Sequence, residues 1–331
     1  MWIGGFSMSK VHCIGVLTSG GDAPGMNAAI RAVVRAAKYY GIRVMGIKNG
    51  YEGLLHGDIF EMDARFVSET MQRGGTILKT ARSKEFKEIE GVKRGINEAG
   101  YFGIDGLVVI GGDGSFRGAK DLCENGLPTI GIPGTIDNDI PYTEYTIGFD
   151  TAINTAMEAV DKIRDTASSH SRCNIIKVMG RNSGNIALNV GIASGAEAIL
   201  IPEKEIDFEN DIVKPIEQGR NRNKKHFIII LAEGVKTDVS ELEKKIEEET
   251  GIETRTTILG YLQRGGSPTV LDRVRASEMG VRAVQLLKEG IGNRVIGVKN
   301  SEIYDIDIFE ALSMENKVRE DLVDLSKILS I

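Results

Sequence analysis

Three loops of the chain combine glycine with aspartate in a pattern suited to binding a polyphosphate. They are Gly20-Gly21-Asp22, Gly111-Gly112-Asp113-Gly114-Ser115 and Pro133 to Asp139. Backbone N–H groups of glycines and of a helix N-terminus can cradle phosphate, and a carboxylate such as Asp113 can hold a Mg²⁺ ion that neutralises phosphate oxygens. One such loop is as readily an ordinary strand-to-helix turn. Three of them favour a shared site for a polyanion and a metal.

The third loop holds two carboxylates, Asp137 and Asp139, two residues apart. At this spacing they can do different work: one accepts a proton from an attacking hydroxyl, and the other orders a phosphate or a metal. General-base assistance contributes roughly 10²–10⁴ in rate. The alternative is an Asx-rich turn with solvated carboxylates. The position after an apolar run favours catalysis.

Arginines add positive charge beside these and other glycine-rich turns. The guanidinium fork matches phosphate geometry, although a single arginine is more often a surface charge. Other catalytic schemes find little support, since the chain has no Walker sequence, no G-x-S-x-G elbow and no C-x-x-C pair. The five candidates are Arg82, Arg172, Arg181, Arg255 and Arg264.

Short apolar runs alternate with helical patterns along the chain. This order predicts mostly parallel sheets covered by helices on both faces, so we expect an α/β protein with two similar three-layer domains. Ligands of such sheets bind beyond the carboxyl ends of the strands, where the three loops lie. The predicted strands are Val11 to Leu17, Ile42 to Ile47, Leu107 to Ile110, Thr129 to Ile132, Ile175 to Met179, Ala198 to Ile201 and Phe227 to Leu231.

Composition and charge narrow the classes of function that the chain can have. The 331 residues suggest about two domains, and the net charge of 41 − 47 = −6 disfavours nucleic acid as a partner. Three widely separated cysteines fit a reducing compartment, so we expect a cytoplasmic protein. No apolar run approaches a membrane span, and the first ten residues lack the pattern of a signal peptide.

Taken together, these motifs resemble the 6-phosphofructokinase family, and are close to its bacterial ATP-dependent type. The similarity runs from about Val11 through nearly the whole chain. The matching segments are Gly15 to Asn27, Val109 to Ser115, Pro133 to Asp139, Val178 to Arg181 and Gln263 to Pro268.

The resemblance implies a phosphofructokinase-like fold and phosphoryl transfer from MgATP to the 1-hydroxyl of fructose 6-phosphate. Asp137 would be the general base and Asp139 a supporting carboxylate, and Asp113 would bind Mg²⁺. Charge on the transferring phosphoryl would be stabilised by Arg82 and Arg181, because phosphoryl transfer depends on positioning and cationic groups. The ATP site would comprise Gly21, Arg82, Ser83, Gly112, Asp113, Gly114 and Ser115.

The same resemblance implies a sugar-phosphate site shared between subunits of a homotetramer. Arg172 and Arg255 would reach the phosphate bound by a neighbouring subunit, while Arg264 acts in its own chain. Where the family usually has histidine, this chain has Tyr261, which donates a hydrogen bond but adds no charge. The remaining sugar-site residues would be Thr135, Ile136, Asp137, Met179, Gly180, Arg181 and Glu233.

Two glycines bear on the phosphoryl donor. Related pyrophosphate-dependent enzymes typically have Asp at the position of Gly114 and Lys at that of Gly134, so the resemblance favours ATP. A pyrophosphate-dependent enzyme is one alternative. A lipid or dinucleotide kinase and an inactive nucleotide-binding regulatory subunit are others. Neither lipid nor dinucleotide kinases carry the segment Thr135 to Asp139, and intact Asp113, Asp137 and Arg181 disfavour loss of catalysis.

An effector site for ADP or phosphoenolpyruvate is also implied. Arg31 and Arg35 share one helix face, and the basic stretch Arg220 to Lys225 is either part of this site or a solvated loop. Ala64 stands where the family often has arginine, with Arg65 beside it, and Glu69 replaces a shorter Asp, so we expect altered strength of regulation. The effector residues would be Arg31, Arg35, Arg164, Gly195, Arg222, Lys224, Lys225 and His226.

From the family pattern we expect a larger ATP-binding domain and a smaller sugar-phosphate domain. The larger would comprise residues 10–147 plus 260–310, and the smaller 148–259 plus 311–331.

Overall fold

The computed structural model describes residues 11–316 and 318–329, and the segment considered for a signal peptide lies outside them. The chain forms two compact units. The larger runs to Thr135 and includes Ile140–Gly148 and Ser267–Glu315. The smaller comprises Ile136–Asp139, Phe149–Gly266 and the chain from Asn316 onward. Among the described residues, no helix combines the length and apolar character needed to cross a membrane.

The larger unit is built on a seven-stranded sheet in the order β11-β10-β5-β4-β1-β2-β3. The five inner strands are parallel, whereas β3 and β11 pair antiparallel at the edges. Antiparallel edges close a parallel sheet without a further crossover helix. The strands are β1 (Cys13–Thr18), β2 (Arg43–Ile47), β3 (Ile59–Glu61), β4 (Gly106–Gly111), β5 (Thr129–Pro133), β10 (Arg294–Lys299) and β11 (Glu302–Asp307).

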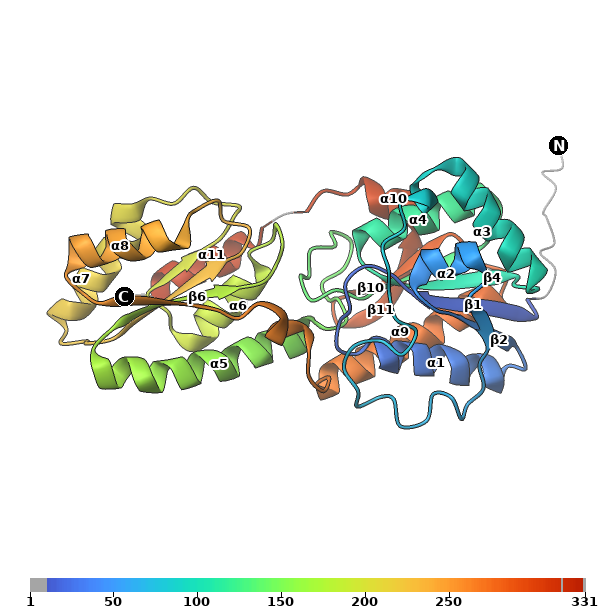
Figure 1. Cartoon of the computed structure of the whole chain (residues 1–331), viewed down its shortest axis with the longest axis horizontal. Coiled ribbons are helices and arrows are strands. Elements are labelled where there is room, and N and C mark those ends of the chain that lie inside the picture. Colours follow the sequence, from blue (N-terminus) through green and yellow to red (C-terminus); the bar gives the residue numbers. More distant parts are fainter. Residues whose placement is uncertain (1–10, 317, 330–331) are drawn as a thin grey trace. The chain divides into compact units, whose positions relative to one another are not determined.

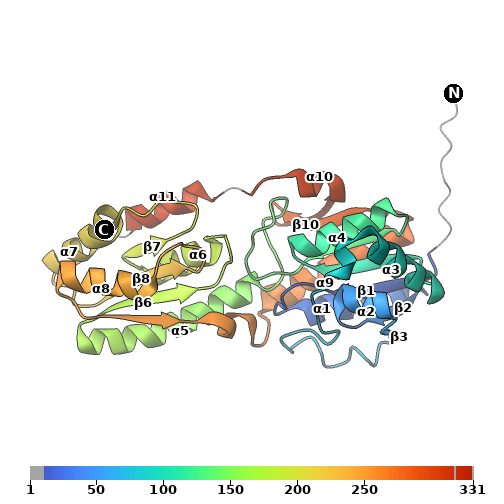
Figure 2. The same cartoon turned by 45° about the horizontal axis from the view of Figure 1, so that its top comes forward.

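Helices cover both faces of this sheet, as Figures 1 and 2 show. On one face lie α1 (Met26–Tyr39) and α9 (Val270–Lys288), packed closely because small residues meet: a Cβ on Gly280 would stand 2.6 Å from the Cβ of Ala32. The other face carries α2 (Gly50–His56), α3 (Ile89–Tyr101), α4 (Asp113–Glu124) and α10 (Ile308–Ser313), with a short 3₁₀ turn at Glu85–Lys87 before α3.

The smaller unit has a four-stranded parallel sheet in the order β7-β8-β6-β9. Its central strands β8 and β6 are buried except for the half-buried Lys177, as expected for a parallel sheet covered on both faces. The strands are β6 (Cys173–Val178), β7 (Ala198–Leu200), β8 (Phe227–Ala232) and β9 (Thr254–Ile258). The helices are α5 (Phe149–His170), α6 (Asn185–Ser194), α7 (Lys214–Asn221) after a π turn at Glu209–Val213, α8 (Val239–Thr250), the 3₁₀ helix η3 (Gly260–Arg264) and α11 (Glu320–Leu329).

The expected α/β class with mostly parallel sheets is confirmed, and the predicted strands are present with ends shifted by one or two residues. Four strands were not predicted: β3, β9, β10 and β11. The β10–β11 hairpin turns at Asn300 and Ser301, both with positive φ (51° and 65°). Neither residue is glycine, the residue that normally signals such a turn in a sequence.

The two units divide at different residues from those expected. Residues 136–139 and 260–266 belong to the smaller unit rather than the larger one. The physical reason lies in their contacts. The carbonyl of Asn138 accepts a hydrogen bond from the Asn185 side chain at 2.7 Å, and η3 packs on α5.

Candidate active site

In the larger unit the carboxyl ends of β1, β4 and β5 meet at one edge, because these strands are neighbours in the sheet. The Ser19 N–H donates to the Ile110 carbonyl at 3.0 Å, and the Gly134 N–H to the Gly111 carbonyl at 2.9 Å. The three glycine-rich loops grouped from the sequence therefore begin at adjacent strands, and the part of each that belongs to the larger unit lies along one edge of its sheet.

Glycine is required at one of these turns for lack of space. A Cβ on Gly111 would stand 2.4 Å from the Ser115 Oγ and 2.5 Å from the Ser19 carbonyl oxygen. By contrast, a Cβ on Gly114 meets no atom within 4 Å, and the residue is exposed. The backbone is thus tightly packed behind the loop and open at its outer side.

Asp113 is the first residue of α4, which follows the N-cap Gly112. Its carboxylate accepts a hydrogen bond from the Arg117 Nε at 2.9 Å, one turn further along the helix, and its side chain is 43% exposed. A single accessible carboxylate fits Mg²⁺, which is usually held by one or two carboxylates together with substrate phosphates. Ser115 is buried in the same turn.

The segment before Arg82 is fastened to the end of β1 by threonine hydroxyls. The Thr18 Oγ1 donates to the Lys79 carbonyl and the Thr80 Oγ1 to the Gly20 carbonyl, both at 2.8 Å. These bonds bring the segment that ends at Arg82 and Ser83 to the same edge as the exposed Gly21. Arg82 itself is exposed, so its guanidinium is accessible to a ligand.

In the smaller unit the central feature is the buried carboxyl of Asp137, which is 6% exposed. Its pKa is raised from 3.8 to about 6, mainly by burial and next by the negative charge of Asp139. The guanidinium groups of Arg264 and Arg181 oppose this rise, while Glu233 adds to it more weakly. A carboxyl with a pKa near 6 is well suited to accept a proton near neutral pH.

Two turns next to this carboxyl have left-handed backbone at non-glycine residues. Asn138 has φ 48° and Arg181 φ 57°, conformations that cost free energy and often occur at functional sites. Each turn is held by a side chain from elsewhere: Asn185 donates to the Asn138 carbonyl at 2.7 Å, and the Arg181 N–H donates to the Glu233 Oε1 at 2.6 Å. Asn185 was not among the predicted residues.

The structure does not bring Arg172 and Arg255 to Asp137. They lie at the start of the neighbouring strands β6 and β9, where Arg172 pairs with Glu253 at 2.8 Å and Arg255 with the same carboxylate at 2.5 Å. Met179 follows the opposite end of β6. At about 3.3 Å per residue, the two ends are roughly 20 Å apart. One chain therefore cannot direct these arginines and the turn at Met179 toward the same phosphate.

Comparison with known proteins identifies the fold and the family. The phosphofructokinase family model matches residues 13–287. The chain is 58% identical to the ATP-dependent 6-phosphofructokinase of Alkaliphilus metalliredigens, over 96% of this chain and 99% of that protein. The chain belongs to the phosphofructokinase family.

Other phosphofructokinases show the same relationship. Identity to the ATP-dependent 6-phosphofructokinase of Clostridium botulinum is 57% over 97% of this chain and 100% of that protein. The solved phosphofructokinase of Saccharomyces cerevisiae superposes with a TM-score of 0.87 at 35% identity. The match covers 97% of this chain and 48% of the yeast chain. A pyrophosphate-dependent phosphofructokinase from Marinobacter aquaeolei matches with a TM-score of 0.84 over 96% of this chain and 91% of that one. Its identity of 21% shows the fold alone.

The remaining predicted residues of the sugar site differ in burial and in backbone conformation. Thr135 and Ile136 are buried, and the Thr135 carbonyl accepts from the Thr146 hydroxyl at 2.7 Å. Gly180 has φ 137°, where any side chain would be strained. Tyr261 lies on η3 and is 83% exposed, so no burial of its side chain holds the hydroxyl in place.

Several predicted effector residues come together in the smaller unit. Arg164 donates to the Ser194 carbonyl, next to Gly195, and the Lys224 ammonium pairs with Glu197. Burial, together with the positive charges of Lys224 and Arg164, lowers the pKa of His226. Arg222 and Lys225 are exposed on the same loop. Arg31 and Arg35 belong to α1 of the larger unit, where burial and the charge of Arg35 lower the pKa of Arg31.

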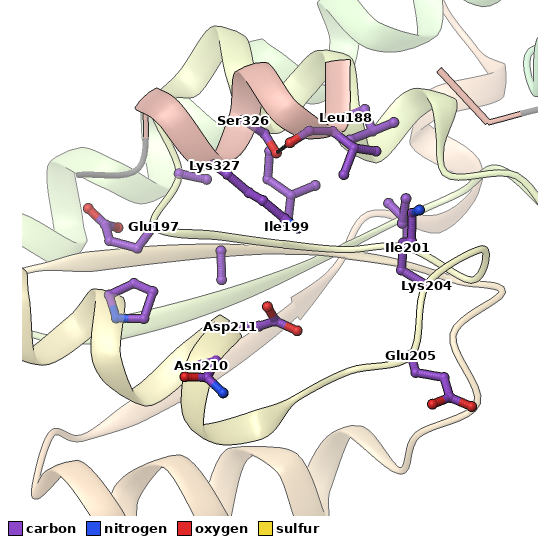
Figure 3. A pocket seen from close by; sticks show the side chains of 14 residues that line it. Leu188, Glu197, Ile199, Ile201, Lys204, Glu205, Asn210, Asp211, Ser326 and Lys327 are labelled. Atoms are coloured by element: carbon purple, nitrogen blue, oxygen red, sulfur yellow. Dashed lines mark hydrogen bonds between the residues drawn. The ribbon is translucent and has the colours of Figure 1, made fainter. Parts of the chain in front are cut away.

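Glu197 was not predicted from the sequence. Among the described residues it is the only buried carboxylate beside the basic group of Arg164, Lys224 and His226. It also accepts from the Ile228 N–H at 2.7 Å. It borders a pocket beside α11 and β7, whose lining includes Leu188, Ile199 and Lys327 (Figure 3). Among the described residues, none of the predicted site residues lines this pocket.

Proposed function

We propose that this chain is an ATP-dependent 6-phosphofructokinase. It transfers the terminal phosphoryl of MgATP to the 1-hydroxyl of fructose 6-phosphate and yields fructose 1,6-bisphosphate and ADP, the committed step of glycolysis. The observation that carries the proposal is 57–58% identity, over nearly the full length of both chains, to curated bacterial enzymes with this name. Three buried cysteines without disulfides suit the cytoplasm that we assign to it.

Asp137 acts as the general base. Its pKa of about 6 leaves most of the carboxyl ionised at neutral pH, yet basic enough to take the proton of the attacking hydroxyl. Asp139 supports it by electrostatics. Arg181 and Arg82 stabilise the negative charge that spreads over the transferring phosphoryl, and Thr135 adds polar contact to the sugar.

Asp113 would hold Mg²⁺ when ATP binds, and the ion would neutralise charge on the phosphates. Its carboxylate pairs with Arg117 in the structure, so this ion pair must open as the metal binds. The glycine-rich turn at Gly112 and Gly114 would place backbone N–H groups against the phosphates of ATP, and Ser83 would contribute from the neighbouring segment.

ATP is favoured over pyrophosphate by two glycines. The outer side of Gly114 is open, and the aspartate of pyrophosphate-dependent enzymes would repel a nucleotide phosphate there. At Gly134 a Cβ would stand 3.1 Å from the Ile110 Cγ2 and 3.2 Å from the Met26 Cε, so a lysine at this position needs its neighbours to move.

We further propose a homotetramer in which Arg172 and Arg255 bind the sugar phosphate of a neighbouring subunit, while Met179, Gly180, Arg181, Glu233, Tyr261 and Arg264 bind it in their own. The separation of these groups along β6 supports the assignment. ADP or phosphoenolpyruvate would bind as effectors at the basic group around Arg164 and Lys224, since guanidinium and ammonium groups suit phosphate.

The function is tested by a coupled assay with fructose 6-phosphate and either ATP or pyrophosphate. We expect turnover with MgATP only, and a loss of roughly 10²–10⁴ in kcat for Asp137→Ser with sugar binding retained. Equal turnover with pyrophosphate would refute the donor assignment. No turnover with either donor would favour an inactive nucleotide-binding subunit.

Subunit sharing is tested by mixing two inactive variants, Asp137→Ser and Arg255→Leu. Hybrid tetramers contain sites with both residues intact, so we expect partial recovery of activity after the mixture is dissociated and reassembled. Absence of recovery, with hybrids shown by mass spectrometry, would place Arg255 outside the shared site.

A further inference from the structure

The side chain of Gln263 joins the two segments that carry the arginines next to Asp137. Gln263 lies in η3, directly before Arg264, and is completely buried. Its Oε1 accepts a hydrogen bond from the Met179 N–H at 2.8 Å, across 84 residues of sequence. Two residues beyond Met179 lies Arg181, the other arginine that lowers the pKa of Asp137.

This bond supplies an acceptor that the sheet does not. The parallel pairing of β6 with β8 ends at Val178, and with β9 at Lys177. The Met179 N–H therefore lies beyond the strand ladder, and a buried N–H needs a partner. Side chains hold the turn that follows at two backbone N–H groups, since Gln263 accepts from the N–H of Met179 and Glu233 from that of Arg181.

The other end of the same amide is unsatisfied. Its Nε2 is buried and has no hydrogen-bond partner among the described residues. A buried donor without a partner is costly, so an apolar side chain of this size would be the more stable choice if packing alone mattered. The amide is explained by what its oxygen holds.

We propose that Gln263 is a positioning residue for the sugar-phosphate site: through the Met179 N–H it fixes the turn Met179–Arg181 relative to Arg264. The inference rests on the proposed function, because the turn and Arg264 are assigned there to the sugar phosphate. In this proposal Gln263 acts through the Met179 N–H rather than by contact with the substrate. Without this hydrogen bond, the guanidinium groups of Arg181 and Arg264 are no longer fixed relative to each other. The sugar phosphate then meets cations in varying positions.

The test compares Gln263→Met with a matched control, Asn174→Leu. Methionine has a similar volume and removes both the acceptor and the unsatisfied donor. Asn174 is also a buried amide with an Nδ2 that has no partner among the described residues, but it lies near the start of β6, at the opposite end of the strand from Met179. We expect Gln263→Met to raise the KM for fructose 6-phosphate about tenfold, the value of one hydrogen bond, with the KM for ATP unchanged. Asn174→Leu should change neither.

Two further measurements separate positioning from stability. The melting temperature of Gln263→Met should stay within about 2 °C of the wild type, since the lost bond and the removed unsatisfied donor offset each other. Hydrogen exchange at the Met179 amide should become at least tenfold faster. Gln263→Glu keeps an acceptor oxygen at the same reach, and should keep that amide protected and the sugar KM within about threefold of wild type.

The outcomes are distinct. An unchanged sugar KM in Gln263→Met, or equal increases in the KM for both substrates, would overturn the positioning role. So would unchanged exchange at Met179. If the wild type itself fails to phosphorylate fructose 6-phosphate while Met179 exchange responds as expected, the proposed function is wrong and the bond is real.

Discussion

Replacing Asp137 by asparagine is expected to lower kcat by roughly 10²–10⁴ and to make the protein more stable at neutral pH. The carboxyl is buried, and its pKa rises from 3.8 to about 6 mainly for that reason. Between these two pH values the folded protein binds the proton more tightly than the unfolded chain does. The free energy of unfolding therefore falls as pH rises through this window, and the whole penalty is present above about pH 6.

The magnitude follows from the same pKa values. A rise from 3.8 to about 6, at about 1.4 kcal/mol for each pH unit, corresponds to at most about 3 kcal/mol. Asparagine has the same shape and carries no charge, so Asp137→Asn should gain on the order of 1–3 kcal/mol at pH 7.5 and about half as much at pH 5. Such a gain at the expense of activity is typical of residues kept for function.

The assay is urea unfolding of wild type and variant at pH 5 and pH 7.5, together with kcat in the coupled assay. The exposed carboxylate of Asp161 on α5 offers a control in the same unit, and Asp161→Asn should alter neither stability nor kcat. A variant of Asp137 that is less stable than wild type at pH 7.5, or that keeps its turnover, would refute the reasoning.

Two further predictions concern the neighbours of this carboxyl and the nucleotide loop. Asp139→Asn should shift the acid limb of the pH profile of kcat/KM to lower pH, because the charge of Asp139 raises the pKa of Asp137; a limb that stays in place or moves upward would contradict this. Gly111→Ala should cost about 1–3 kcal/mol of stability by overpacking and weaken ATP binding, since its Cβ would meet the Ser115 Oγ at 2.4 Å. Thermal unfolding and the KM for ATP check it, with Gly100→Ala as the control, where a Cβ meets no atom within 4 Å.

Much of the fold was predictable because it depends on local pattern. Apolar runs that end in glycine and aspartate predicted β1, β4 and β5 and the edge at which their loops lie. The edge strands β3 and β11 were not predicted, because they are short or half-exposed and lack a continuous apolar run. The boundaries between the units depended on contacts such as that of Asn138 with Asn185, which pattern alone does not reveal.

The sequence by itself determined which chemical groups are present and that they follow the carboxyl ends of parallel strands, where ligands of such sheets bind. It also determined the family, through long motifs in one order. Only the tertiary structure decided the state of those groups. Burial and nearby charge set the pKa of Asp137, Gln263 reaches Met179 across 84 residues, and Arg255 lies at the far end of β6 from that turn. These properties depend on which side chains meet after folding, and spacing along the chain does not specify such meetings.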